Sequence, residues 1–428
     1  MANLVNLLAA PTRVETPFIK VTIGEFTFGK WDQQSYNKLD KDTGRLQKIT
    51  EIQFPNYVQS LNVVKVNGTV NQYTLQLSYP ITDRNDPNFF EKVFGSVSKT
   101  RRIVFSYGDL SLPTYSYKDE EALITAINSK FDMAGSCIRY TVKATSTSAP
   151  ALSGNYTFTK KFAKPSDEIK RLLFTKVYGL QELFTGMRDK GLVEQYNLIE
   201  SDDIPVDIEA KTNISILDYL SYLVSCMTPV GGTKKARVIK SNVYAFNIID
   251  DTSGVFGGPY FKVLKIRNNS QMVDNLCSYV IDVGYPTANI VTDLNIDNNE
   301  NYSIFYDYTN ELNDSDYSLR INDAGEIEYV YAPILSSSND QLKTTEVERS
   351  WWTKVTSYPI RGSITLKGLL RPAILMTYIK LNILFYGRKH IHSGYYIITR
   401  QEDQVDASGF KTTLNLTRIA GDSSEELL

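Results

Sequence analysis

Strict alternation of apolar and polar residues is the feature that most limits how this chain folds. The clearest case is residues 57–66 and 69–79, which flank Asn67-Gly68, a pair preferred in the two-residue turn of a β-hairpin. In the second arm, polar residues alternate with Tyr73, Leu75, Leu77 and Tyr79. Successive side chains of a strand point to opposite faces, so the pattern predicts a sheet with one buried face.

The rest of the first 150 residues repeats this pattern with one interruption. Residues 19–28 predict a hairpin that turns at Gly24-Glu25, and residues 102–107 and 138–144 predict further strands. The interruption is a helix, capped by Asp86 with Pro87 in its first turn and marked by Phe90, Val93, Phe94 and Val97 at helical spacing. We therefore expect residues 1–150 to form an N-terminal β-barrel domain with one helix laid against it.

The middle of the chain changes period. Residues 145–154 are small and polar and predict a linker. Residues 160–228 predict a small α/β domain, with helical stripes that include Ile169, Leu172 and Leu173, then Leu180, Leu183, Phe184 and Met187 before Gly191, and a capping box at Ser215 and Asp218. Residues 230–348 mix short strands with Asn- and Asp-rich runs and predict a loop-rich β domain, which ends in a second linker at 336–348.

The last 80 residues return to the strand pattern, and we expect residues 349–428 to form a second β-barrel domain. Residues 395–402 and 410–419 should pair as an antiparallel hairpin with Gly409 in its turn at positive φ. In the final strand Leu414 and Leu416 should point into the core, and Thr413, Asn415 and Thr417 should face the other way.

The expected fold is mainly β with an α/β insert, and α+β overall. Two tube-type β-barrel domains flank a small α/β domain and a loop-rich β domain. The chain has 28 Tyr and 19 Phe residues. Aromatic residues favour strands, and Tyr also favours assembly surfaces, so the excess fits either a β-rich fold or an interface.

Charge and cysteine content exclude several classes. The 46 Lys and Arg residues against 48 Asp and Glu give a net charge of -2, without the basic excess of a protein that grips nucleic acid by its phosphates. Cys137, Cys226 and Cys277 are far apart and form no CxxC pair, so neither a disulfide framework nor a zinc site is expected. Buried free thiols are the interpretation we favour.

The chain offers few catalytic side chains. His390 and His392, its two histidines, would share one face of a strand as a metal pair, but no third ligand lies nearby. Residues 254–258 are Gly-rich, yet they precede a strand and not the helix that a phosphate cradle needs. GxSxG, Walker A and HExxH motifs are absent from the sequence. We therefore expect no catalytic, cofactor-binding or metal-binding residues and no enzyme.

Two alternatives stay open. Carboxylate pairs at Asp202-Asp203, Asp250-Asp251 and Asp297 with Glu300 have the residue types of a glycosidase, although acidic loop residues are usually solvated. Trp351-Trp352 would face opposite sides of a strand, filling a barrel and an interface, or would serve as a sugar-binding platform.

The N-terminus lacks the basic segment of a signal peptide. The most apolar stretch, residues 366–386, is interrupted by Arg371, Pro372, Lys380 and Asn382. We expect no membrane span.

Residues 351–422 resemble the last domain of tail hub proteins of long-tailed phages, the baseplate hub and late-control type. The matching elements follow the family's order: Gly362, then Gly368-Leu369-Leu370-Arg371-Pro372, then Ser393-Gly394-Tyr395-Tyr396-Ile397-Ile398, then Ser408-Gly409-Phe410-Lys411-Thr412-Thr413-Leu414-Asn415-Leu416. The N-terminal segments TPFIKV, FPNYVQSL and DPNFFEKVF look like the first hub domain, whereas residues 230–348 depart from the family in their long loops.

The resemblance implies a structural subunit of the virion tail tip or baseplate, assembled in the host bacterial cytoplasm. Such hubs form homotrimers that join a six-fold tail tube to a three-fold tip and line the DNA exit channel. The implied partners are a distal tail or tail tube protein, the tape-measure C-terminus and a central spike or fibre. DNA would pass without specific binding. The alternative is a receptor-binding or polysaccharide-degrading tail protein of the same virion.

We predict negligible DNA binding, because non-specific affinity scales with the number of phosphates that cationic groups neutralise. Filter binding of the purified chain across a salt series checks this. Tight binding with a steep salt dependence would contradict the prediction.

Overall fold

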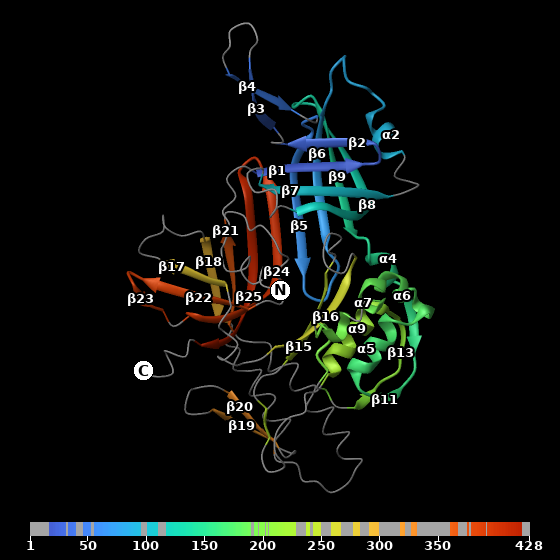
Figure 1. The fold of residues 1–428 in the computed structure, drawn as a ribbon, viewed down its shortest axis with the longest axis vertical. Coiled ribbons are helices and arrows are strands. Elements are labelled where there is room, and N and C mark those ends of the chain that lie inside the picture. Colours follow the sequence, from blue (N-terminus) through green and yellow to red (C-terminus); the bar gives the residue numbers. More distant parts are fainter. Residues whose placement is uncertain are drawn as a thin grey trace.

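The computed structural model describes residues 17–30, 33–39, 46–52, 55–95, 101–109, 117–189, 192–195, 197–201, 203, 205–227, 237–239, 243–249, 258–266, 277–282, 291–298, 317–321, 327–331, 360–366, 375, 378–390 and 392–421 (Figure 1). The fold over these residues is mostly β, as the alternation predicts. None of the helices in this part of the chain has the length and apolar character needed to cross a bilayer.

The N-terminal strands form an antiparallel run in the order β5-β6-β9-β8-β7-β1-β2. Their bounds are β1 Pro17–Ile23, β2 Phe26–Lys30, β5 Val58–Val66, β6 Gln72–Pro80, β7 Arg102–Asp109, β8 Tyr117–Asp132 and β9 Cys137–Ser146. Gly29 N donates to Pro55 O at 3.1 Å, which brings the last strand of the run beside the start of the first. A separate hairpin, β3 (Gln33–Leu39) with β4 (Leu46–Ile52), projects from this end (Figure 1).

The predicted hairpin at Asn67-Gly68 is confirmed: β5 pairs β6, and Gly68 has φ +71°. The predicted helix is present as α2 (Phe89–Phe94), but it begins later than expected. The Asp86 carboxylate accepts a hydrogen bond from Asn88 N at 2.8 Å, and the Asp86 carbonyl accepts one from Phe89 N. Asp86 therefore closes a turn ahead of the helix instead of capping it directly.

The inward residues of these strands and of α2 form one hydrophobic core. Phe89 of α2 joins this core, stacked on Tyr79 with ring centroids 3.9 Å apart and in contact with Phe28 and Tyr57. Two residues of the distant C-terminal hairpin, Val405 and Phe410, belong to this same core.

The middle of the chain forms a second core of short helices and strands. They are α4 Ala149–Leu152, β10 Asn155–Phe158, β11 Lys161–Ala163, α5 Pro165–Leu173, the 3-10 turn Lys176–Tyr178, α6 Leu180–Leu183, α7 Thr185–Asp189, α8 Leu192–Gln195, β12 Val206–Ile208, β13 Lys211–Ser215, α9 Ile216–Cys226, β15 Val243–Ile249 and β16 Tyr260–Ile266. The capping box is confirmed, since Ser215 Oγ accepts from Asp218 N at 3.0 Å.

Two expectations for the middle region are wrong. Residues 145–154 are no open linker, because Ser146, Ser148 and Leu152 are buried and α4 lies within the segment. The helical stripe from Leu180 to Met187 is split between α6 and α7, although Phe184 and Met187 are buried as the stripe requires. The first error arises because small polar residues can also be buried, and the second because apolar spacing reports burial more directly than helix continuity.

The C-terminal strands build a third core. They are β17 Cys277–Asp282, β18 Val291–Asn298, β21 Ile360–Leu366, β22 Tyr378–Phe385, β23 Arg388–Lys389, β24 Gly394–Asp406 and β25 Gly409–Gly421. A separate small sheet holds β14 Arg237–Ile239, β20 Ile327–Tyr331 and β19 Tyr317–Ile321. Strands β17 and β18 come from the stretch expected to be loop-rich, and they pack with the C-terminal core.

The predicted register of the terminal hairpin is confirmed. Strands β24 and β25 pair antiparallel, Leu414 and Leu416 are buried in the third core, and Thr413 is half-buried on the other face. Gly409 follows the Ala407-Ser408 turn with φ +112°, a backbone region that disfavours a side chain.

The two strand-rich parts are not separate sheets. Strand β24 pairs with β5, so β18-β21-β25-β24 continue into β5-β6-β9-β8-β7-β1-β2 within one 14-stranded hydrogen-bonded sheet. In Figure 1 the C-terminal hairpin accordingly lies alongside β5.

We predict that Leu414→Ala lowers the free energy of unfolding by about 2–5 kcal/mol, because it leaves a cavity in the third core. The matched control Thr413→Ala removes a half-buried side chain and its hydroxyl contact with Thr365, and should cost about 1 kcal/mol. Urea unfolding of both variants measures the difference. Equal costs at the two positions would overturn the register.

Candidate functional site: the polar cluster between two cores

Strand β24 changes partners along its length. Its first residues, Gly394 to Ile397, pair with β22, whereas Arg400 to Val405 pair with β5. The change falls at an irregularity between Ile398 and Arg400, where Thr399 O accepts a hydrogen bond from Asn67 N at 3.0 Å. Strand β25 follows the opposite edge throughout, so the β24–β25 hairpin reaches both cores.

Polar residues take inward positions where the hairpin meets the N-terminal strands. Gln401 and Asp403 of β24 and Thr412 of β25 are fully buried. Thr412 Oγ1 donates to Asp403 Oδ1 at 2.7 Å, and Gln401 Nε2 donates to Asp403 Oδ2 at 2.9 Å. Each carboxylate oxygen of Asp403 therefore has a donor from the hairpin itself.

The N-terminal strands contribute an ion pair to the same site. Lys65, directly opposite Gln401 in the β5–β24 register, is 3% exposed, and its Nζ lies 3.1 Å from Glu120 Oε1 on β8. The hydroxyls of Tyr73 and Tyr107 donate to Glu120 Oε2 at 3.3 and 3.5 Å. Lys65 Nζ also lies 4.3 Å from the centre of the Tyr117 ring, a cation–π contact.

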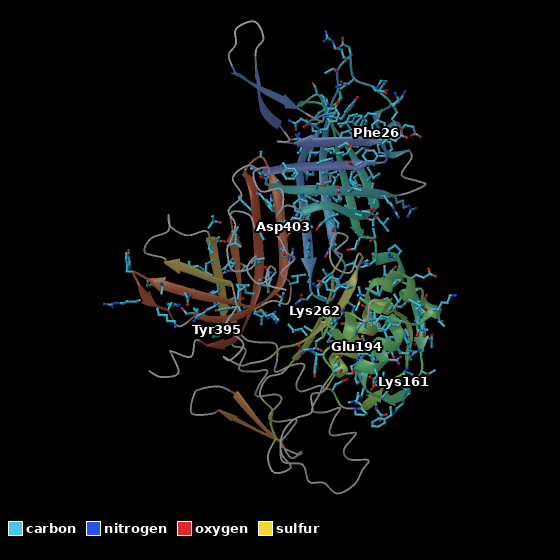
Figure 2. All side chains as sticks on the ribbon, in the orientation of Figure 1. Phe26, Lys161, Glu194, Lys262, Tyr395 and Asp403 are labelled. Carbon is cyan, nitrogen blue, oxygen red and sulfur yellow. The ribbon has the colours of Figure 1, made fainter. Side chains whose placement is uncertain are left out.

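On the inward face a side-chain hydrogen bond joins the two halves: Gln401 Nε2 donates to the Tyr117 hydroxyl at 3.0 Å. We call Lys65, Tyr117, Glu120, Gln401, Asp403 and Thr412 the junction cluster. Figure 2 labels Asp403 where the hairpin faces the N-terminal strands.

Burial dominates the electrostatics of the junction cluster. It raises the pKa of Asp403 to about 6, even though Lys65 and the donors Thr412 and Gln401 favour the ionised carboxylate, and Glu120 adds to the rise. Burial, with Glu120 and Asp403 nearby, also raises the pKa of Tyr107 well above its usual value. Two carboxylates thus lie near one lysine, with Lys65 and Asp403 buried and Glu120 partly buried.

This arrangement holds strands together and offers no chemistry to a substrate, because its polar atoms are enclosed and already paired. Buried ion pairs are poor sources of net stability, but breaking one by removing a partner is strongly destabilising. The junction cluster therefore favours a single pairing of β24 with β5.

The histidine pair lies elsewhere, after β23 and ahead of β24. The His390 and His392 rings have centroids 4.8 Å apart, and His390 packs 4.9 Å from Phe385. Neither residue lies in a strand, in contrast to the expected geometry. Over the described ranges, no three His, Cys, Asp or Glu side chains gather as metal ligands would.

Of the acidic pairs, Asp203 and Asp297 lie among the described residues, in separate parts of the fold. Asp203 is 1% exposed, and it accepts hydrogen bonds from Ser166 N at 2.9 Å and Ser166 Oγ at 2.6 Å, capping α5 from 37 residues away. The expectation of a solvated loop carboxylate is wrong there, and burial raises its pKa despite those bonds. Asp297 lies on β18 opposite Arg361.

Several candidates lie outside the described residues: Asp202, Asp250, Asp251, Glu300, Trp351, Trp352 and residues 254–257. Cys137 and Cys226 are buried free thiols, as predicted, and the side chain of Cys277 is among those not described.

Sequence reasoning missed the junction cluster, although a signal was available. In β5 the inward positions run Leu61, Val63 and then Lys65, and in β24 they run Gln401, Asp403 and then Val405. Polar residues at inward positions of a strand indicate a buried polar partner.

Comparison with known proteins gives likeness in fold at very low sequence identity. No protein-family model matches the chain, and no curated protein matches it in sequence. A tail protein from Neisseria meningitidis MC58 is 7% identical, with a TM-score of 0.45 over 94% of this chain and 97% of that one. The 43 kDa tail protein of prophage MuSo2 from Shewanella oneidensis is 10% identical, with a TM-score of 0.44 over 94% and 98%.

A third solved structure is the E. coli c3393 protein, described as a component of the type VI secretion system similar to the T4 bacteriophage tail proteins gp27 and gp5. It is 10% identical, with a TM-score of 0.43 over 94% of this chain and 78% of that one. Tail and baseplate hub-type proteins are the class that the resemblance of residues 351–422 indicates.

We predict that Lys65→Met lowers the free energy of unfolding by about 3–5 kcal/mol at pH 7.5, because it leaves Glu120 and Asp403 buried without a cation. Lys143→Met, on the exposed face of β9, is the matched control and should change stability little. Chemical unfolding reports both values. Equal effects of the two changes would contradict a structural role for Lys65.

Proposed function

We propose that this chain is a structural tail hub subunit of a phage virion. Three copies form a ring that joins a six-fold tail tube to a three-fold tip or spike and lines the channel through which DNA leaves. Its partners are a distal tail or tail tube protein, the tape-measure C-terminus and a central spike or fibre. It acts at the tail tip after assembly in the bacterial cytoplasm, and it catalyses no reaction.

The continuity of the sheet through β24 and β5 carries this proposal. It ties two strand-rich cores of one chain into a single unit. Three such units present six strand-rich cores around an axis, which is the geometry needed to meet a six-fold tube while keeping three-fold symmetry.

The residues of the sequence resemblance that the structure describes support the proposal, because they build this unit, and residues 368–372 lie outside the described ranges. Segment 408–416 forms the turn and first half of β25, and segment 393–398 leads into β24. Gly362 of β21 pairs with Leu416, and a side chain there would come within 2.8 Å of Asn295 O. The glycine is therefore required where β18 and β21 pair.

An open edge and exposed apolar side chains support assembly. The described path of the sheet ends at β2, which lies beside the start of β5, and at β18, whose outer edge can pair with a neighbouring chain. Phe131 and Met133, at the tip of the β8–β9 hairpin, are 64% and 81% exposed. Large exposed apolar groups of this kind favour contacts with partners.

The alternative, a receptor-binding or polysaccharide-degrading tail protein, has less in its favour. A glycosidase needs two carboxylates at a fixed separation. Among the described residues, Asp297 lies on strand β18 opposite Arg361. The register of these described strands places no second carboxylate next to it.

Mass photometry of the purified chain tests the proposal, and we expect a species of three times the chain mass. A Phe131→Ser, Met133→Ser double variant should weaken assembly of the ring or its docking to tail partners, whereas Lys130→Ser, on the same strand, should not. A chain that stays monomeric at every concentration, even with the other tail proteins present, would contradict the proposal.

A further inference from the structure

We propose that the junction cluster is a proton-sensitive latch, which holds the β24–β25 hairpin against β5 and β8 and lets the two strand-rich cores part locally while each stays packed. This inference concerns the single chain, so it does not depend on the trimeric ring or on any tail partner.

The contacts across the junction differ in kind from those inside either core. Six residue pairs join β24 to β5, from Arg400 opposite Val66 to Val405 opposite Leu61. On the hairpin the inward side chains at this crossing are mainly polar, with Val405 and Phe410 as its apolar members, and on β5 they are Leu61, Val63 and Lys65. The outward face adds another polar contact, a hydrogen bond of 2.9 Å from Asn62 Nδ2 to Glu402 Oε1.

Such a junction can open while exposing only a modest area of apolar surface to water. Parting β24 from β5 returns Lys65, Glu120 and Asp403 to water, which solvates charges better than the protein interior does. The third core keeps Leu414, Leu416 and Tyr396 on the hairpin, and the first core keeps its own strands from β1 to β9. Local opening is therefore favoured over unfolding of either core.

Six strands each contribute a charged or titratable group, or a donor, to the latch. Lys65 comes from β5, Tyr73 from β6, Tyr107 from β7, Tyr117 and Glu120 from β8, Asp403 and Gln401 from β24, and Thr412 from β25. Lys65 and Glu120 pair with each other at 3.1 Å, so a charge on Asp403 is the one left without a counter-ion in the cluster. A proton on Asp403 makes the enclosed group neutral overall.

The sign of the pH effect follows from this balance. The pKa of Asp403 is about 6 in the closed junction, against its usual value of 3.8. Protonation therefore favours the closed latch, and that advantage is fully present below pH 3.8 and is lost as the pH rises through 6. The latch is tightest in mild acid and loosest above neutrality.

Hydrogen–deuterium exchange of the full-length chain at pH 5 and pH 7.5, corrected for intrinsic exchange, tests the latch. If the open form exposes Asp403 to water, opening of the β5–β24 amides should increase about tenfold between these pH values. Amides of β9 and β21, inside the two cores, should change far less.

Asp403→Asn removes the titrating group, and its β5–β24 opening should become nearly independent of pH. Asp406→Asn is the matched control: the pKa of Asp406 lies below its usual value, because hydrogen bonds from Ser408 outweigh burial, so it does not titrate in this range. Glu120→Gln provides a second variant if Asp403→Asn fails to fold. It relieves the repulsion on Asp403, so the increase with pH should shrink.

If the junction amides exchange together with the amides inside both cores, the opening is global, and this result would overturn the proposal. An increase with pH that Asp403→Asn leaves unchanged would also overturn it. Neither result depends on whether the chain forms trimers, so the latch and the hub function fail or survive separately.

Discussion

The backbone pairing of β24 with β5 is the interaction on which the rest of the architecture depends. Strand β24 has 13 residues and serves two cores: Tyr396 and Ile398 point into the third, and Val405 into the first. Its partner β25 does the same through Phe410, Leu414 and Leu416. One hairpin therefore sets how the two strand-rich parts lie relative to each other.

The junction cluster explains why this pairing has a single register. A slip of one residue would turn Gln401 and Asp403 outward and drive Glu402 and Gln404 into the enclosed site. Tyr117 would then lose its hydrogen bond from Gln401, and Asp403 would lose its place near Lys65. An apolar crossing would tolerate such a slip more readily, since apolar contacts are not directional. The buried charged groups lower the stability of the junction, and their directional contacts fix its register.

The fold divides clearly into what local sequence determines and what it does not. The hairpins at Asn67-Gly68 and at Ser408-Gly409 could be predicted because turn chemistry and alternation act over a few residues. The pairing of β24 with β5 joins residues about 340 positions apart, and nothing local distinguishes it from a free edge. The same holds for Asp203, which caps a helix across 37 residues.

The candidate site was harder to foresee than the fold. Its residues come from β5, β8, β24 and β25, and the inward polar positions of β5 and β24 indicate a buried polar partner without identifying it. Only the topology brings Lys65 opposite Gln401. The histidines and acidic loops drew attention because they are rare or clustered in sequence, yet the described part of the chain puts them to structural use or leaves them apart.

The shared strand also bears on how the protein is made. Strand β5 is synthesised early, and its partner β24 follows about 340 residues later. At ribosomal speeds of roughly 5–20 residues per second, that separation corresponds to tens of seconds. Throughout this interval the C-terminal half of β5 presents an unpaired edge that carries Lys65. A charged side chain on an exposed edge discourages pairing with the wrong strand. The lysine that later lies buried in the junction thus also protects the nascent sheet until its last hairpin arrives.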